Sequence, residues 1–170
     1  SQTNCLSSGQ VLPPDYNYED GRIIVREMGD LQCLELVEKG LVTDSVTLHV
    51  GYANRFTKKS AHGTAALTIT TSSAKQLSEQ VLKLYDRIVD QSTPVHRVSL
   101  TFNDVVDERY QQYDLFVDPA ELERERIMQK TVLDLKEKFG KNAILKGMNL
   151  QEGATTMERN RQIGGHKSGK

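Results

Sequence analysis

The sequence lacks the features that mark several specialised classes of protein. Tryptophan is absent, there are only two cysteines, and no apolar run reaches the ~20 residues of a membrane-spanning helix. Cys5 and Cys33 have no metal-like spacing, so they are interpreted as free thiols in a reducing compartment. The first ten residues carry neither the basic nor the apolar segment of a secretory signal. We therefore expect a cytoplasmic protein with no membrane partner.

The net charge is also close to zero. The 22 Lys and Arg residues nearly balance the 23 Asp and Glu residues, which leaves −1 at neutral pH. This balance excludes a uniformly basic nucleic-acid binder, so any basic surface must be local. The four histidines lack the spacing of a zinc site, and no metal is predicted.

Alternation of apolar and polar residues predicts three long strands, at 42–52, 63–71 and 95–103. In the first of them Val46, Leu48 and Val50 point to one side, while Thr47 and His49 point to the other. A shorter strand is expected at 4–12.

Two helices are predicted between these strands. Apolar residues at steps of three and four indicate a helix over roughly 19–39, and Ser73 followed by Gln76 is the signature of a capping box at the start of the second. The order is that of a split β-α-β-β-α-β unit. The fold class is therefore α+β, with a four-stranded antiparallel-type sheet, two helices on one face and the other face open.

Small polar residues dominate the predicted open face. Its members are Ser45, Thr47, His49, Thr68, Thr70, Arg97, Ser99 and Thr101. Hydroxyl groups bind phosphate oxygens well, and Arg55, Lys58 and Lys59 lie in the connection beside them. The pattern favours a grip on a nucleic-acid backbone. The alternative is an ordinary solvated face, because threonine and serine are common there.

Both ends of the chain resemble one family. The opening phrase at 1–13 and the tail phrases at 138–147, 152–160 and 162–167 resemble the little finger region of Y-family translesion DNA polymerases, in the UmuC-like branch. The resemblance covers essentially the whole chain. It implies the same fold, with the open face along the primer–template duplex.

The resemblance also implies roles for single residues. The implied DNA-backbone contacts are Ser7, Ser8, Gly9, Thr47, His49, Thr68, Arg97 and Ser99, with Arg55, Lys58 and Lys59 reaching adjacent phosphates. The palm, fingers and thumb would precede Ser1, and the palm would hold the catalytic Mg2+. This fragment is expected to lack catalytic activity and a cofactor of its own. The implied setting is DNA repair and SOS mutagenesis in a bacterial cytoplasm.

After a DNA-binding domain at 1–109, the sequence predicts an extension at 110–170. In it, Gln112, Leu115 and Phe116 resemble the bacterial sliding-clamp pentapeptide, in which the two apolar side chains anchor and the glutamine orients. The alternative is a short edge strand that tucks both apolar residues against the core. A helix at about 119–139 and a basic, glycine-rich tail follow.

Three functions compete. The leading hypothesis is a DNA-binding and clamp-docking module of a translesion polymerase. The alternative is a protein-interaction module without DNA binding of its own. A small α+β enzyme is disfavoured, since no acid, base and nucleophile converge in the pattern.

Overall fold

The computed structural model describes residues 4–110 and 118–140. The elements are β1 (Leu6–Tyr16), α1 (Tyr18–Lys39), β2 (Leu41–Tyr52), β3 (Ala61–Thr71), α2 (Ala74–Ile88), β4 (Val95–Asn103), β5 (Val106–Asp107) and α3 (Pro119–Phe139). The chain divides into two compact units between Arg126 and Ile127. The first unit carries every strand, α1 and α2, and it confirms the predicted α+β class.

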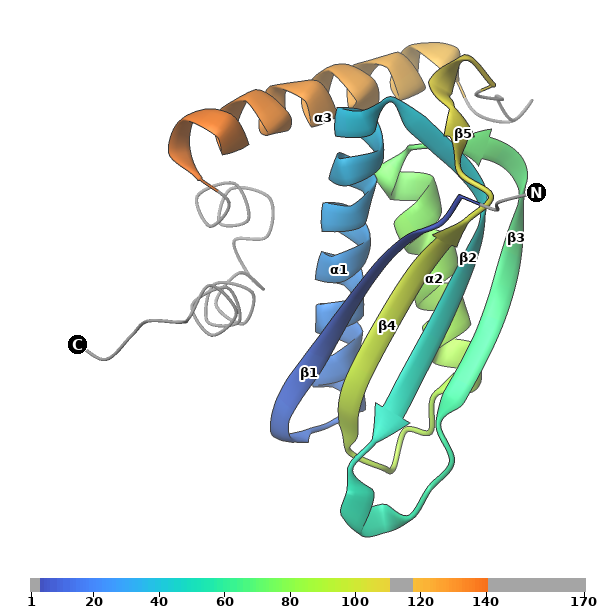
Figure 1. Cartoon of the computed structure of the whole chain (residues 1–170), viewed down its shortest axis with the longest axis vertical. Coiled ribbons are helices and arrows are strands. Elements are labelled where there is room, and N and C mark those ends of the chain that lie inside the picture. Colours follow the sequence, from blue (N-terminus) through green and yellow to red (C-terminus); the bar gives the residue numbers. More distant parts are fainter. Residues whose placement is uncertain (1–3, 111–117, 141–170) are drawn as a thin grey trace. The chain divides into compact units, whose positions relative to one another are not determined.

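The main sheet has the strand order β1-β4-β2-β3, and every neighbouring pair is antiparallel. The connection through α1 passes over β4, and the connection through α2 passes over β2, so both β-α-β halves are split as predicted. Figure 1 shows α1 and α2 on the same face of this sheet, with the other face uncovered. The short β5 pairs separately with the start of β2.

Local hydrogen bonds set the ends of the helices. Asn17 and Asp20 form a reciprocal capping box at the start of α1, and Gly40 ends that helix at φ 65°. The capping box predicted for α2 is only half formed. Ser73 Oγ accepts from the amide of Gln76, but the amide of Ser73 donates to Thr71 Oγ1 instead, at 3.0 Å. The Gln76 side chain therefore has no amide to return to.

The core lies between the sheet and its two helices. Leu48 of β2, Leu100 of β4 and Leu77 of α2 are completely buried there, which confirms the predicted inward face of each element. Burial of one such side chain contributes about 1.5–3 kcal/mol. Gly63 of β3 permits close approach of α2, because a Cβ there would lie 2.9 Å from Leu84 Cδ1.

Two predicted boundaries were wrong. The first strand does not stop before Pro13 but continues to Tyr16, with irregular register after Val11 and with Asp15 at φ 67°. Proline is tolerated there because β1 is an edge strand, where one row of amides has no strand to pair with. The second correction concerns His62, which lies in β3 rather than in the loop before it.

The first turns of α3 belong to the sheet-bearing unit. Leu122 is buried, and the Glu125 carboxylate accepts from Ser73 Oγ at 2.6 Å and from the amide of Lys75 at 2.8 Å. A carboxylate at the N-terminus of α2 also complements the dipole of that helix. None of the helices in the described residues is long and apolar enough to cross a membrane.

Candidate nucleic-acid interface

The sheet face opposite α1 and α2, called the open face below, is organised in rows that cross the strands. One row joins Ser7, Thr101, Thr47 and Thr64 through consecutive strand pairings, and is called the hydroxyl row. Two of its contacts are hydroxyl–hydroxyl hydrogen bonds, Ser7–Thr101 at 2.9 Å and Thr47–Thr64 at 2.8 Å. A hydroxyl donates one hydrogen and accepts others, so the row can donate to phosphate oxygens.

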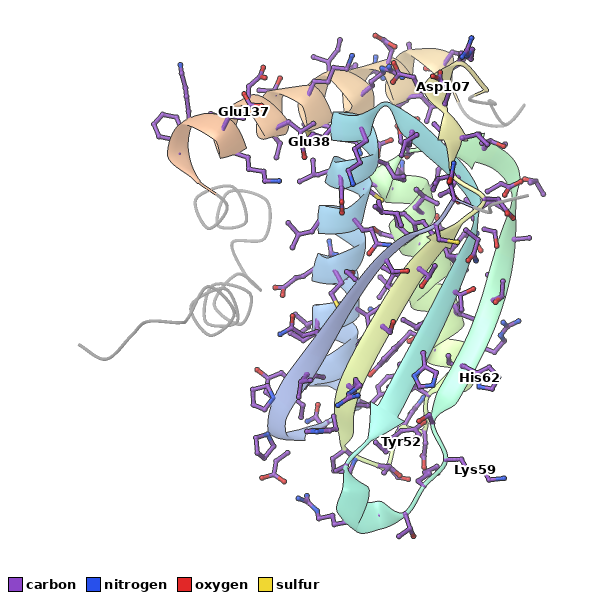
Figure 2. The ribbon with its side chains drawn as sticks, in the orientation of Figure 1. Glu38, Tyr52, Lys59, His62, Asp107 and Glu137 are labelled. Atoms are coloured by element: carbon purple, nitrogen blue, oxygen red, sulfur yellow. The ribbon has the colours of Figure 1, made fainter. Side chains whose placement is uncertain are left out.

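A second row contains Gly9, Ser99, His49 and His62. The two imidazoles, both exposed, stack with ring centroids 6.3 Å apart and planes inclined by 21°. Figure 2 labels His62 on the outer strand β3. Gly9 leaves the row open at its other end, because it has no side chain to cover the backbone of β1.

The rows are free of carboxylates. Asn103 extends the polar surface, since its amide donates to Ser45 Oγ at 3.1 Å and to Thr47 Oγ1 at 2.8 Å. Arg97 lies opposite Gly51 and Val11, is exposed, and has no ion pair among the described residues. Its guanidinium is available to an anion that approaches this face.

Ser8 does not belong to the open face. Its hydroxyl donates to Gln32 Oε1 at 2.5 Å on the helix-covered side of the sheet. The amide of Gln32 in turn donates to the carbonyl oxygens of Leu6 at 2.8 Å and Leu100 at 3.3 Å. The grouping of Ser8 with Ser7 and Gly9 is thus corrected: its side chain helps to fasten the edge strand β1.

The loop between β2 and β3, residues 53–60, carries the three predicted cations. Arg55 pairs with Asp15 at 2.7 Å, and its guanidinium carbon lies 4.8 Å from the ring centroid of Phe56. Lys58 forms an ion pair with Asp90. Lys59 is exposed and has no ion pair among the described residues; in Figure 2 it points away from the loop.

Comparison with known proteins identifies the family. The model of the impB/mucB/samB family C-terminal domain matches residues 5–115. This chain belongs to that family. The match confirms the prediction that this chain corresponds to the C-terminal region of Y-family DNA polymerases.

The curated relatives carry polymerase and repair names. The chain is 26% identical over 162 residues to "DNA polymerase IV 2" of Halalkalibacterium halodurans. It is 24% identical over 164 residues both to "Putative UV-damage repair protein UvrX" and to "DNA polymerase IV 2" of Bacillus subtilis. These matches cover 95% to 96% of this chain but only 39% of each relative.

Several polar residues on the open face of this impB/mucB/samB-type domain were not predicted from the sequence. His62, Thr64 and Asn103 lie on the open face but were not among the predicted contacts. The signal for the first two was present, because the alternation of Thr68 and Thr70 continues backward through 66 and 64 to 62. The predicted members Ser7, Gly9, Thr47, His49, Thr68, Arg97 and Ser99 do share the face.

Other predicted sites of this family member lie elsewhere. Gln112, Leu115 and Phe116 are outside the described residues, so the clamp peptide stays a prediction. Within 4–110 and 118–140, no three histidine, cysteine or acidic side chains are grouped so that they could hold a metal ion.

Proposed function

We propose that this chain is the DNA-binding module of a translesion DNA polymerase and that its open face holds the backbone of the primer–template duplex. One observation carries this proposal: the hydroxyl row and the second row, which contains His49 and His62, have no carboxylate and are flanked by Arg97 and Lys59. Hydroxyls and cations on a sheet suit phosphates of any sequence. The module therefore binds DNA without reading bases, in DNA repair and the SOS response.

The chemistry of the parent enzyme belongs to other domains of the same polypeptide. Relatives of this chain named as DNA polymerases extend well beyond the matched part, which is 39% of their length. Nucleotide transfer requires metal-binding carboxylates, which we assign to a palm domain together with its Mg2+. This chain alone is inactive in that scheme, and it places the duplex for the palm.

A second contact is proposed with the sliding clamp. Gln112, Leu115 and Phe116 supply the polar key and two apolar anchors of a clamp-binding peptide. The peptide directly follows the predicted DNA-binding domain at 1–109 in sequence, so one chain would hold both the duplex and the clamp.

Binding of a fluorescent primer–template duplex across a salt series tests the DNA grip. Each phosphate contact contributes about −0.9 to the slope of log affinity against log salt, so three to five contacts give a slope of roughly −3 to −5. Replacing Arg97 and Lys59 together by glutamine should weaken binding and flatten the slope by about 1.8. Duplexes of different sequence should behave alike.

Lys75→Gln with Lys83→Gln is the matched control, because these two exposed lysines lie on α2 and not on the sheet. The control should leave the slope nearly unchanged. Absence of duplex binding even at low salt would instead favour the alternative, a protein-interaction module.

A further inference from the structure

The three cations of the loop at residues 53–60 are held in different ways. Two carboxylates reach this loop from distant parts of the chain: Asp15 at the end of β1 binds Arg55, and Asp90 after α2 binds Lys58. Lys59 has neither of these partners and points outward. A phosphate approaching the loop therefore meets three cations of unequal availability.

The contact of Lys58 is part of a built anchor. Besides Lys58, the Asp90 carboxylate accepts from the amide and hydroxyl of Ser92, at 2.9 and 2.8 Å, and from Thr93 Oγ1 at 2.8 Å. The amide of Asp90 donates to Tyr52 Oη at 2.9 Å, and the Lys58 ammonium lies 5.6 Å from the centroid of that same ring. Lys58 thus contacts both the carboxylate of Asp90 and the ring of Tyr52, and the hydrogen bond from the Asp90 amide to the Tyr52 hydroxyl links these two partners.

The electrostatics of Asp90 agree with this geometry. The Lys58 ammonium, with the hydrogen bonds from Ser92 and Thr93, holds the pKa of the Asp90 carboxyl well below its usual range. The carboxylate therefore remains charged wherever the protein is folded at ordinary pH, and it keeps its hold on Lys58.

The contact of Arg55 is of another kind. The side chains of Arg55 and Asp15 are 56% and 74% exposed, and the guanidinium gives this carboxylate one hydrogen bond, at 2.7 Å. Exposed single-contact pairs contribute little and exchange readily for another anion. An approaching phosphate therefore competes with the Asp15 carboxylate for Arg55.

We infer that Lys58 is a positioning residue rather than a phosphate ligand: through Asp90 and Tyr52 it fixes the loop so that Lys59 meets the DNA backbone, while Asp15 competes with phosphate for Arg55. This inference rests on the proposed DNA-binding function. It divides three basic residues of one loop into an anchor (Lys58), a direct contact (Lys59) and a contact for which Asp15 competes (Arg55).

Two substitutions that each remove a negative charge should change duplex affinity in opposite directions. Asp90→Asn should lower duplex affinity, by about three- to fivefold, because the gain from removing a negative charge is smaller than the loss of the loop anchor. Asp15→Asn should raise affinity, because Arg55 is released. Glu79→Gln on α2, which removes the same charge away from the loop, is the control and should change affinity little.

The double variant with Asp90 and the salt slope distinguish the roles of Lys58 and Lys59. Lys58→Met should cost at least as much affinity as Asp90→Asn, because it removes the same anchor together with a positive charge. The double variant should be no weaker than Lys58→Met alone, and Lys58→Arg should restore binding because it keeps the ion pair. Lys59→Met should flatten the salt slope by about 0.9. An increase in affinity on Asp90→Asn, or an unchanged slope on Lys59→Met, would overturn the assignment.

Trypsin cleavage after Lys59 provides a readout that needs no DNA. Loss of the anchor should accelerate this cleavage in Asp90→Asn and Lys58→Met but not in Asp15→Asn or Lys58→Arg. Equal cleavage rates in all variants would show that Lys58 does not fix the loop. If the unaltered chain fails to bind duplex, the proposed function is wrong, while the cleavage rates still decide whether Lys58 is an anchor.

Discussion

At the scale of single residues, close packing in this domain depends on small side chains at helix contacts. Gly21 lies on α1, where a Cβ would come within 2.6 Å of both Tyr85 Oη and Val95 Cγ2. Neither neighbour can move easily, because both are buried and the Tyr85 hydroxyl donates to the carbonyl oxygen of Tyr18 at 2.7 Å. Gly21 is therefore required by packing and not by backbone conformation.

We expect Gly21→Ala to destabilise the fold by roughly 1–2 kcal/mol in urea unfolding, since overpacking costs more than the helix propensity that alanine gains. Gly29→Ala on the same helix is the matched comparison, because it gains the same propensity while the nearest atom, Ser78 Oγ, lies 3.3 Å away. If Gly21→Ala is as stable as Gly29→Ala, the close contact is not a constraint.

Residue-level prediction from sequence failed where a partner was distant in the chain. The family resemblance implied a backbone contact for Ser8, and the polar residues at inward positions of β1 obscure the alternation that would have separated Ser8 from Ser7. The reason lies 24 residues away, where Gln32 satisfies the Ser8 hydroxyl beneath the sheet. The same limit applies to Arg55 and Lys58, whose carboxylate partners are 40 and 32 residues away.

At the scale of elements, prediction succeeded because each strand and helix carries its own pattern. The inward faces of β2 and β4 and the N-cap of α2 follow from local sequence and are confirmed by the structure. Contacts between helices do not follow from such patterns. α1 is joined to α2 by Asp86, which accepts from Tyr18 Oη and from Arg22 Nε, the latter at 2.9 Å.

The contact between these two helices shifts the pKa values of Asp86 and Tyr18. The hydrogen bond from Arg22, and then that from Tyr18, lowers the pKa of Asp86 against the opposing effect of burial. Burial and the bond to Asp86 raise the pKa of Tyr18 to about 12. Since the pKa of Asp86 is lower in the folded state than in the unfolded state, the carboxylate stabilises the fold above the unfolded-state pKa and loses this effect as pH falls.

We therefore expect Asp86→Asn to lower the free energy of unfolding by about 1 kcal/mol at pH 7, a modest value because the ion pair is part-exposed. The difference from the unaltered chain should shrink below about pH 4 as the carboxyl becomes protonated. Urea unfolding at neutral and acidic pH measures both values, with Glu79→Gln as the control for an exposed helix carboxylate. A difference that does not depend on pH would show that the carboxylate charge is not responsible.

At the scale of the whole molecule, the distribution of charge matters more than the net charge. The net charge is only −1, yet the paired positions of the open face carry no carboxylate. Composition could not show this arrangement, because it arises from strand parity and topology. The family match at residues 5–115 covers the sheet-bearing part and ends within the predicted clamp peptide.

This arrangement predicts that the two proposed contacts of the molecule can be removed separately. Replacing Leu115 and Phe116 by alanine should abolish binding to a bacterial sliding clamp and leave duplex affinity unchanged, because the apolar anchors act in a cleft of the clamp. Replacing Arg97 and Lys59 by glutamine should do the reverse. Fluorescence titrations of both variants against clamp and duplex measure the four values. Loss of duplex affinity in the alanine variant would instead mean that these apolar side chains pack against the domain, the edge-strand alternative that the sequence left open.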